Sequence, residues 1–157
     1  MQLSNAGLNL IKTGEGFKPH LYNCPANDAS IGYGHLVHHG PICGAASEAP
    51  FAGGISEQQG TALLLEDAAY AQHAVEHLVK VPLTQGQYDS LVSFTYNEGA
   101  GRLQSSTLLK DLNAGDFGSV PAQLEEWVYG GGMKLPGLVT RRAAEASMFV
   151  ESQTRAV

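Results

Sequence analysis

The sequence has no run of about 20 apolar residues, the length that a membrane-spanning helix needs. Its first residues show no basic start followed by an apolar stretch, so we expect no cleavable signal peptide and no stable membrane insertion. It has only two cysteines, Cys24 and Cys43, too few for the disulfide framework of a small secreted domain. It shows no internal repeat and no low-complexity tract. We therefore expect a globular chain made in the cytoplasm.

Basic residues are also scarce. Nine lysines and arginines stand against fifteen aspartates and glutamates, which gives a formal net charge of -6. Neutralising phosphates requires clustered positive charge, so we expect no nucleic-acid partner. Net charge governs solubility and association rates rather than the chemistry of a site. A length of 157 residues with 43% hydrophobic residues fits one domain over residues 1–157.

The pattern along the chain predicts an α+β fold. Ser4 is a candidate N-cap for a first helix that ends near Gly14. Residues 19–24 and 30–35 read as two strands, and residues 25–29 supply the turn chemistry between them. Residues 38–55, rich in Gly, Pro and Ala, are predicted to form a long loop. A small N-terminal hairpin lobe is thus expected before a larger helical lobe.

Capping boxes mark two of the later helices. One box begins at Ser56 and opens a helix that stops before Pro82, and the second begins at Thr84. In each box a hydroxyl residue precedes a glutamine by three positions, which satisfies two backbone N–H groups at a helix start. Three more helices are predicted over residues 106–113, 121–128 and 138–152.

Glu15 is the first candidate for chemistry. It lies between Gly14 and Gly16, just after the first predicted helix and directly before the hairpin. A half-buried carboxyl at such a junction can serve as a proton donor to a leaving oxygen. The competing interpretation is a solvated charge at a helix end, which is where most glutamates lie.

The surrounding residues favour the catalytic interpretation. Residues 15–24, EGFKPHLYNC, and residues 30–35, SIGYGH, resemble the catalytic segment of the phage-type lysozyme (endolysin) family, glycoside hydrolase family 24. In that family a Glu is followed after eight intervening residues by Asp or Cys, and after five more by Thr. Glu15, Cys24 and Ser30 fall on those positions. Blocks within residues 87–99, 106–116 and 127–145 also resemble the family.

The resemblance implies a lysozyme-like fold with a cleft between the two lobes and with Glu15 as general acid. It also implies that Cys24 and Ser30 position or activate the water molecule that attacks the sugar. A cysteine in place of Asp is mostly a neutral thiol at pH 7 unless its pKa is shifted, so it can position water or, as a thiolate, attack the sugar carbon. Asp28 is an alternative carboxylate, which turn chemistry explains equally well. A disulfide between Cys24 and Cys43 is a further alternative, structural or redox-switching, that would consume the thiol.

Other site residues follow from family position. His35 is expected to form a structural ion pair with Asp67, and four residues are candidates for contacts with sugars: Leu36, Tyr96, Asn97 and Ser106. His38 with His39, and His73 with His77, do not form a zinc-protease motif, so no metal and no cofactor is expected.

The resemblance implies a bacteriolytic muramidase that cleaves the β-1,4 bond between N-acetylmuramic acid and N-acetylglucosamine in peptidoglycan. It further implies a monomer made in the host bacterial cytoplasm, which reaches the wall after release through a holin pore. Two alternatives stay open because Cys24 and Ser30 depart from the commonest family residues. One is a lytic transglycosylase, and the other is a wall-binding module with impaired catalysis.

Overall fold

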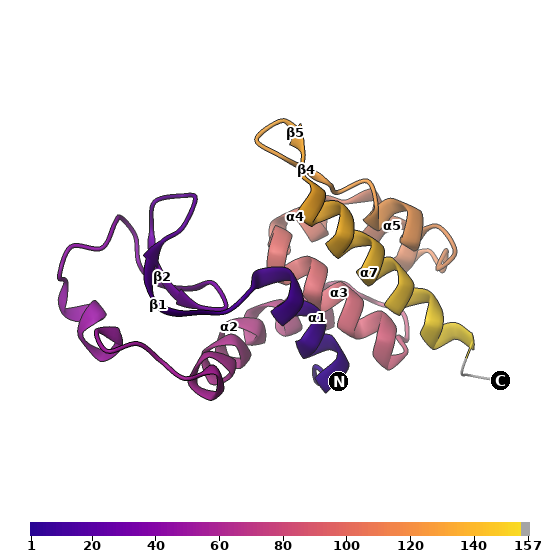
Figure 1. The fold of residues 1–157 in the computed structure, drawn as a ribbon. Coiled ribbons are helices and arrows are strands. Elements are labelled where there is room, and N and C mark those ends of the chain that lie inside the picture. Colours follow the sequence, from indigo (N-terminus) through magenta and orange to yellow (C-terminus); the bar gives the residue numbers. More distant parts are fainter. Residues whose placement is uncertain (155–157) are drawn as a thin grey trace. The chain divides into compact units, whose positions relative to one another are not determined.

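The computed structural model describes residues 1–154 and has the α+β composition that the sequence predicts (Figure 1). The chain divides into two compact units. The first consists of Met1–Gly14 with the chain from Tyr70 onward, and the second is Glu15–Ala69. No helix within residues 1–154 has the length and apolar character required to cross a bilayer.

The unit Glu15–Ala69 contains a three-stranded antiparallel sheet rather than a two-stranded hairpin. Its strands are β1 (Lys18–Asn23), β2 (Ala29–Gly32) and β3 (His35–His38), in the order β1-β2-β3. The second predicted strand, residues 30–35, is therefore wrong in its extent. Its centre is a turn that Gly32 and Gly34 make possible, because their φ angles of +68° and +82° are disfavoured for residues with a Cβ.

The segment predicted as a long loop has more structure than expected. Its first residue, His38, is the last residue of β3, and it contains a short 3₁₀ helix, η1 (Ala46–Phe51). Between them the backbone N–H groups of Gly40, Ile42 and Cys43 each donate to a side chain outside the stretch. The respective acceptors are Asp28, Asn23 and Glu48, each at 2.8 Å.

Glu48 itself is buried beneath this stretch. Hydrogen bonds from the His38 side chain and from the backbone of Cys43 lower the pKa of Glu48 to about 2, against the opposing effect of burial.

Two long helices begin as the capping residues predict. In α1 (Asn5–Glu15) the backbone N–H of Gly7 donates to the Ser4 hydroxyl at 3.2 Å. In α2 (Glu57–Leu78) Ser56 and Gln59 form the reciprocal pair of a capping box, at 2.8 and 3.1 Å. Glu15 is the last residue of α1 and not, as predicted, the residue after it.

The helical unit continues with α3 (Gln85–Glu98), α4 (Ala100–Ser105), α5 (Thr107–Asn113), α6 (Val120–Leu124) and α7 (Pro136–Thr154). The capping box at Thr84 is present. Helix α4, which starts directly after Gly99, was not predicted from the sequence. That glycine has a φ of +92° and ends α3, so two helices follow each other without a loop. The helix predicted over 121–128 ends early, at Leu124. A small antiparallel hairpin follows, whose strands β4 (Tyr129–Gly130) and β5 (Met133–Lys134) have two residues each.

Helices α3 and α7 pack along each other and form the core of the helical unit. Leu91, Phe94 and Phe149 are fully buried there. Beside them lies a buried ionic cluster in which the Glu145 carboxylate accepts hydrogen bonds from Ser93, Arg141 and Arg142. Arg142 also donates to the backbone oxygen of Trp127 at 3.0 Å. Charges this deep are tolerated because each has several partners.

Candidate active site

Glu15 lies against the turn between β2 and β3. Its side chain is half-buried. A Cβ built on Gly34 would lie 3.4 Å from the Glu15 Oε2 atom, so the absence of a side chain at Gly34 leaves room for the carboxylate. The turn and the end of α1 thus place one carboxyl group beside the sheet.

Three residues form a row across the sheet near this carboxylate. Tyr22 on β1 pairs with Ser30 on β2, and Ser30 pairs with Leu36 on β3. Directly opposed residues in an antiparallel sheet project to the same face. Ser30 is buried, whereas Leu36 is exposed. Leu36, predicted to contact a sugar, therefore neighbours Ser30 directly.

Cys24 follows β1 and is a half-buried free thiol; Cys43 is also free. Hydrogen bonding from the Asp28 backbone, with smaller effects of the Ala26 backbone and the Ser30 hydroxyl, holds the pKa of the Cys24 thiol below its ordinary value, although burial opposes the shift. The structure has no bridge between these two cysteines, and the hydrogen bonds around Cys24 favour its thiolate form.

Tyr22 is a further candidate site residue, which was not predicted from the sequence. Burial raises the pKa of the Tyr22 phenol, and the negative charges of Cys24 and Glu15 raise it further. Tyr22 thus lies within electrostatic range of Glu15 and Cys24 and pairs with Ser30 across the sheet. Lys18 lies over the Tyr22 ring, with its Nζ 4.6 Å from the ring centroid. The position of Tyr22 two residues before Cys24 was the available signal, since alternate strand residues share a face.

Asp28, the alternative carboxylate, is occupied elsewhere. Its side chain accepts from the Gly40 backbone at 2.8 Å and lies 3.4 Å from the His39 ring. The Gly40 hydrogen bond, with help from His39, lowers the pKa of the Asp28 carboxyl. Its backbone oxygen accepts from the Cys24 backbone at 3.0 Å and from the Ser30 hydroxyl at 3.2 Å. These contacts favour the interpretation of Asp28 as a turn residue that orders its neighbours.

This geometry offers a proton donor, a polarised thiol and a buried hydroxyl, a combination suited to adding water across an acid-labile bond. Comparisons with known proteins identify the family of the chain. The model of the family described as Phage lysozyme matches residues 12–145. The chain belongs to the phage lysozyme family.

Individual relatives agree. The chain is 38% identical to the endolysin of Bacillus phage B103, covering all of this chain but 57% of that protein. It is 39% identical to the endolysin of Acyrthosiphon pisum secondary endosymbiont phage 1, covering 95% of this chain and 98% of that protein. The solved endolysin from Escherichia coli O157:H7 phage FAHEc1 is 35% identical with a TM-score of 0.81, covering 97% of this chain and 95% of that structure. The predicted enzyme class, a lysozyme, is thereby confirmed.

The residues inferred from family position fall into both units. In the unit Glu15–Ala69, the His35 Nδ1 atom lies 2.9 Å from the Asp67 Oδ2 atom. This hydrogen bond raises the pKa of His35, although burial opposes the shift. The contact has the geometry of an ion pair and holds β3 to α2.

In the helical unit, Tyr96 is half-buried and Asn97 is exposed. Asn97 also accepts a hydrogen bond from Arg142 through its Oδ1 atom. Ser106 is the N-cap of α5: its hydroxyl accepts from the Leu109 backbone at 3.1 Å and donates to the Leu103 oxygen at 2.7 Å. The contacts of Ser106 favour a capping role, and sugar binding by these three residues stays a prediction.

Proposed function

We propose that this chain is a muramidase that hydrolyses the β-1,4 bond between N-acetylmuramic acid and N-acetylglucosamine in bacterial peptidoglycan, with Glu15 as general acid. The observation that carries the proposal is that Ser30 pairs with Tyr22 across the sheet, while Glu15 and Cys24 stand at the spacing from Ser30 that the resemblance to phage lysozymes gives. Family membership supports the class of substrate.

In the proposed reaction Glu15 donates its proton to the glycosidic oxygen as the bond to the sugar carbon breaks. Positive charge then develops on that sugar ring. Cys24 and Ser30 hold the water that attacks the carbon. The thiolate of Cys24, which the lowered pKa favours, accepts a proton from this water, a role that a carboxylate serves elsewhere in the family, and exchange with solvent then returns a proton to Glu15. Each cleavage thus consumes one water molecule and creates one reducing end.

The wider biological role is proposed by the same reasoning. The relatives named above are endolysins. We infer a monomer made in the host cytoplasm that degrades the wall after release by a holin, in a phage or prophage lysis programme.

The test is digestion of purified peptidoglycan by the wild type, Glu15→Gln and Cys24→Ser, with mass spectrometry of released muropeptides. We expect reducing-end fragments from the wild type. Glu15→Gln should lose activity by at least about 100-fold, which is the contribution of a general acid. Asp116→Asn is a matched control, since Asp116 is an exposed residue of the loop between α5 and α6, and asparagine keeps a side-chain oxygen that can accept from the Ser119 backbone.

Two results would replace the proposal. Products that end in an anhydro-sugar would identify a lytic transglycosylase, in which a sugar hydroxyl takes the place of water. A wild type that sediments with peptidoglycan but releases no fragments would identify a binding module.

A further inference from the structure

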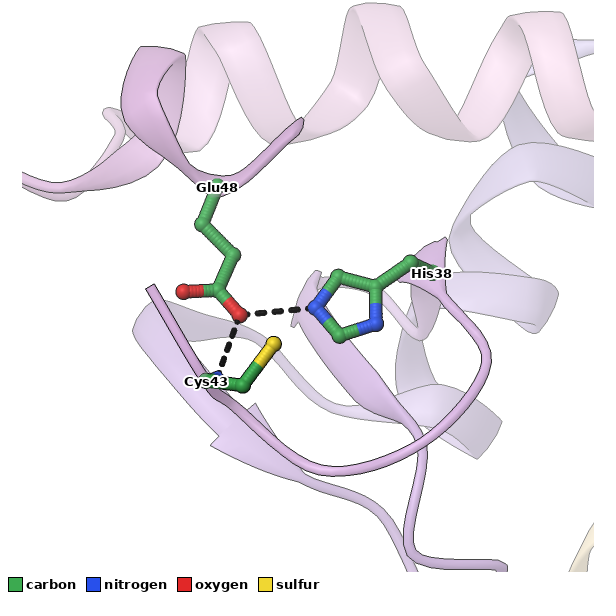
Figure 2. Close-up of side chains that lie close together, drawn as sticks. All are labelled: His38, Cys43 and Glu48. Carbon is green, nitrogen blue, oxygen red and sulfur yellow. Dashed lines mark hydrogen bonds and ion pairs between the residues drawn. The ribbon is translucent and has the colours of Figure 1, made fainter. Parts of the chain in front are cut away.

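A second cluster of reactive side chains lies outside the proposed active site. His38 ends β3, Cys43 follows in the loop, and Glu48 lies in η1. Figure 2 shows the three side chains converging from these segments. One nitrogen, one sulfur and one oxygen atom, one from each residue, all lie within 4.8 Å of one another. We propose that His38, Cys43 and Glu48 bind a zinc ion that fastens the loop to the sheet.

The donor set suits zinc. Imidazole nitrogen, thiolate sulfur and carboxylate oxygen are the protein ligands that zinc prefers, and four-coordinate sites with three protein ligands take water as the fourth. Cys43 is exposed, so solvent reaches this side of the cluster. In a tetrahedral site with bonds of about 2.0–2.3 Å, neighbouring ligand atoms are about 3.3–3.8 Å apart. To reach that spacing, His38 Nε2 and Glu48 Oε1, now 2.7 Å apart, would have to separate around the ion.

The orientation of His38 leaves a place for a cation. Its Nδ1 atom lies 2.8 Å from the backbone oxygen of His39, so Nδ1 carries a proton and donates it. Its Nε2 atom lies 2.7 Å from the Glu48 Oε1 atom, which is an acceptor as well. A positive charge must join Nε2 to that carboxylate, either as a second proton or as a metal ion. A histidine whose Nδ1–H is fixed by a backbone carbonyl is the usual arrangement in metal sites.

The carboxylate is held equally firmly. Glu48 Oε1 accepts from the Cys43 backbone N–H and Oε2 accepts from the Gly44 backbone N–H, both at 2.8 Å. Glu48 is 5% exposed. These hydrogen bonds fix the ligand without using all its lone pairs, which is the support that outer-shell groups give a metal ligand. The sequence analysis considered His38 with His39, whereas the structure brings His38 to Cys43 and Glu48.

Cobalt(II) replaces zinc in such sites and reports directly on the thiolate. The full chain, reduced and kept free of oxygen, is titrated with Co²⁺ as wild type, Cys43→Ser and Cys24→Ser. We expect one equivalent to bind the wild type and to give thiolate-to-cobalt charge-transfer absorption. Cys43→Ser should lose this band. Cys24→Ser, the matched control with the other free thiol removed, should keep it.

The affinity for zinc, measured by competition with a chromophoric chelator, distinguishes the proposed ligand His38 from its neighbour His39. His38→Gln should weaken zinc binding by at least about tenfold, since it removes a ligand. His39→Gln should not, because the His39 side chain is 86% exposed and offers its neighbour only a backbone oxygen. Circular dichroism verifies that each variant is folded. No band in the wild type, a band that survives Cys43→Ser, or equal zinc affinity in the two histidine variants would overturn the proposal and leave a proton-bridged ion pair.

Discussion

Arg142 and Glu145 form an ion pair with no solvent exposure: Arg142 Nη1 lies 2.8 Å from Glu145 Oε2, and both side chains are 0% exposed. The two residues are neighbours on α7, three positions apart. Arg142 also reaches Glu98, at 2.9 Å, and its guanidinium lies 5.0 Å from the centre of the Phe94 ring. The pair therefore joins α7 to α3 through charge as well as through apolar packing.

Replacement of Glu145 by Gln is expected to destabilise the protein strongly. The change leaves Arg141 and Arg142 buried with one carboxylate fewer, and breaking a buried pair in this way costs about 3–5 kcal/mol. The free energy of unfolding from urea denaturation measures the effect. Glu125→Gln, at an exposed position, serves as control and should change stability by less than about 0.5 kcal/mol. Equal stabilities for the two variants would contradict this account of the cluster.

The thiol of Cys24 should react as a thiolate at lower pH than an ordinary cysteine. Alkylation rates of the Cys43→Ser variant, in which Cys24 is the single cysteine, should rise with a midpoint below the reference value of about 8.5. Free glutathione under the same conditions is the reference. Adding Ser30→Ala should move the midpoint upward, because the Ser30 hydroxyl contributes to the lowered pKa. A midpoint at or above that of glutathione would show that these hydrogen bonds do not stabilise the thiolate.

The contact between His35 and Asp67 should make stability depend on pH. The pKa of His35 is raised in the folded chain, mainly by the hydrogen bond to Asp67 and also by the charges of Asp67 and Glu66 on α2. A raised pKa means that the folded state binds the proton more tightly than the unfolded state does. The stabilisation is therefore fully present below the unfolded pKa, about 6.5, and is lost as the pH rises through the folded pKa.

The magnitude of this effect should be at most about 1 kcal/mol, since both side chains are partly exposed. Urea denaturation across this pH range, for wild type and Asp67→Asn, measures it. The difference in stability between the two should shrink as the pH rises. A constant difference would mean that Asp67 acts through packing and not through the histidine charge.

Replacement of Gly34 by Ala should destabilise the turn beside Glu15. Gly34 has a φ of +82°, where a Cβ costs about 1–2 kcal/mol, and the added methyl would lie 3.4 Å from the Glu15 carboxylate. We expect a loss of stability of that size and lower muramidase activity at temperatures where the variant is folded. Gly101→Ala within α4 is the control; it meets no neighbouring atom and should stabilise by about 0.5–1 kcal/mol. The two substitutions should thus have opposite signs in thermal unfolding.

The sequence predicted the features that depend on local chemistry. Ser4, Ser56 and Thr84 cap helices because their hydroxyls reach backbone N–H groups three residues on, a relation contained within a few residues. The structure shows all three caps. The spacing of Glu15, Cys24 and Ser30 was equally visible, since it lies on one short segment.

What the sequence could not show depends on pairing between segments. The turn at Tyr33 and Gly34 divides an apparent strand in two, and the third strand is revealed by its pairing with β2, for example of Ser30 with Leu36. Helix α4 follows α3 after the single residue Gly99, without the loop that sequence patterns use as a boundary. Tyr22 became a site residue only once the sheet placed it beside two charges. The secondary-structure propensities of single residues do not predict such contacts between segments, because these contacts arise from tertiary packing.

The stretch from Gly40 to Gly44 is shaped by acceptors that lie outside it: Asn23, Asp28 and Glu48. All four of these hydrogen bonds are donated by backbone N–H groups, which every residue except proline supplies. The conformation of the stretch therefore depends in part on residues that lie far from it in the sequence. Related chains can therefore diverge at Pro41 and Ile42 while keeping the path of the segment, whereas Gly40 and Gly44, with φ angles of +86° and +78°, and the proposed zinc ligand Cys43 are constrained.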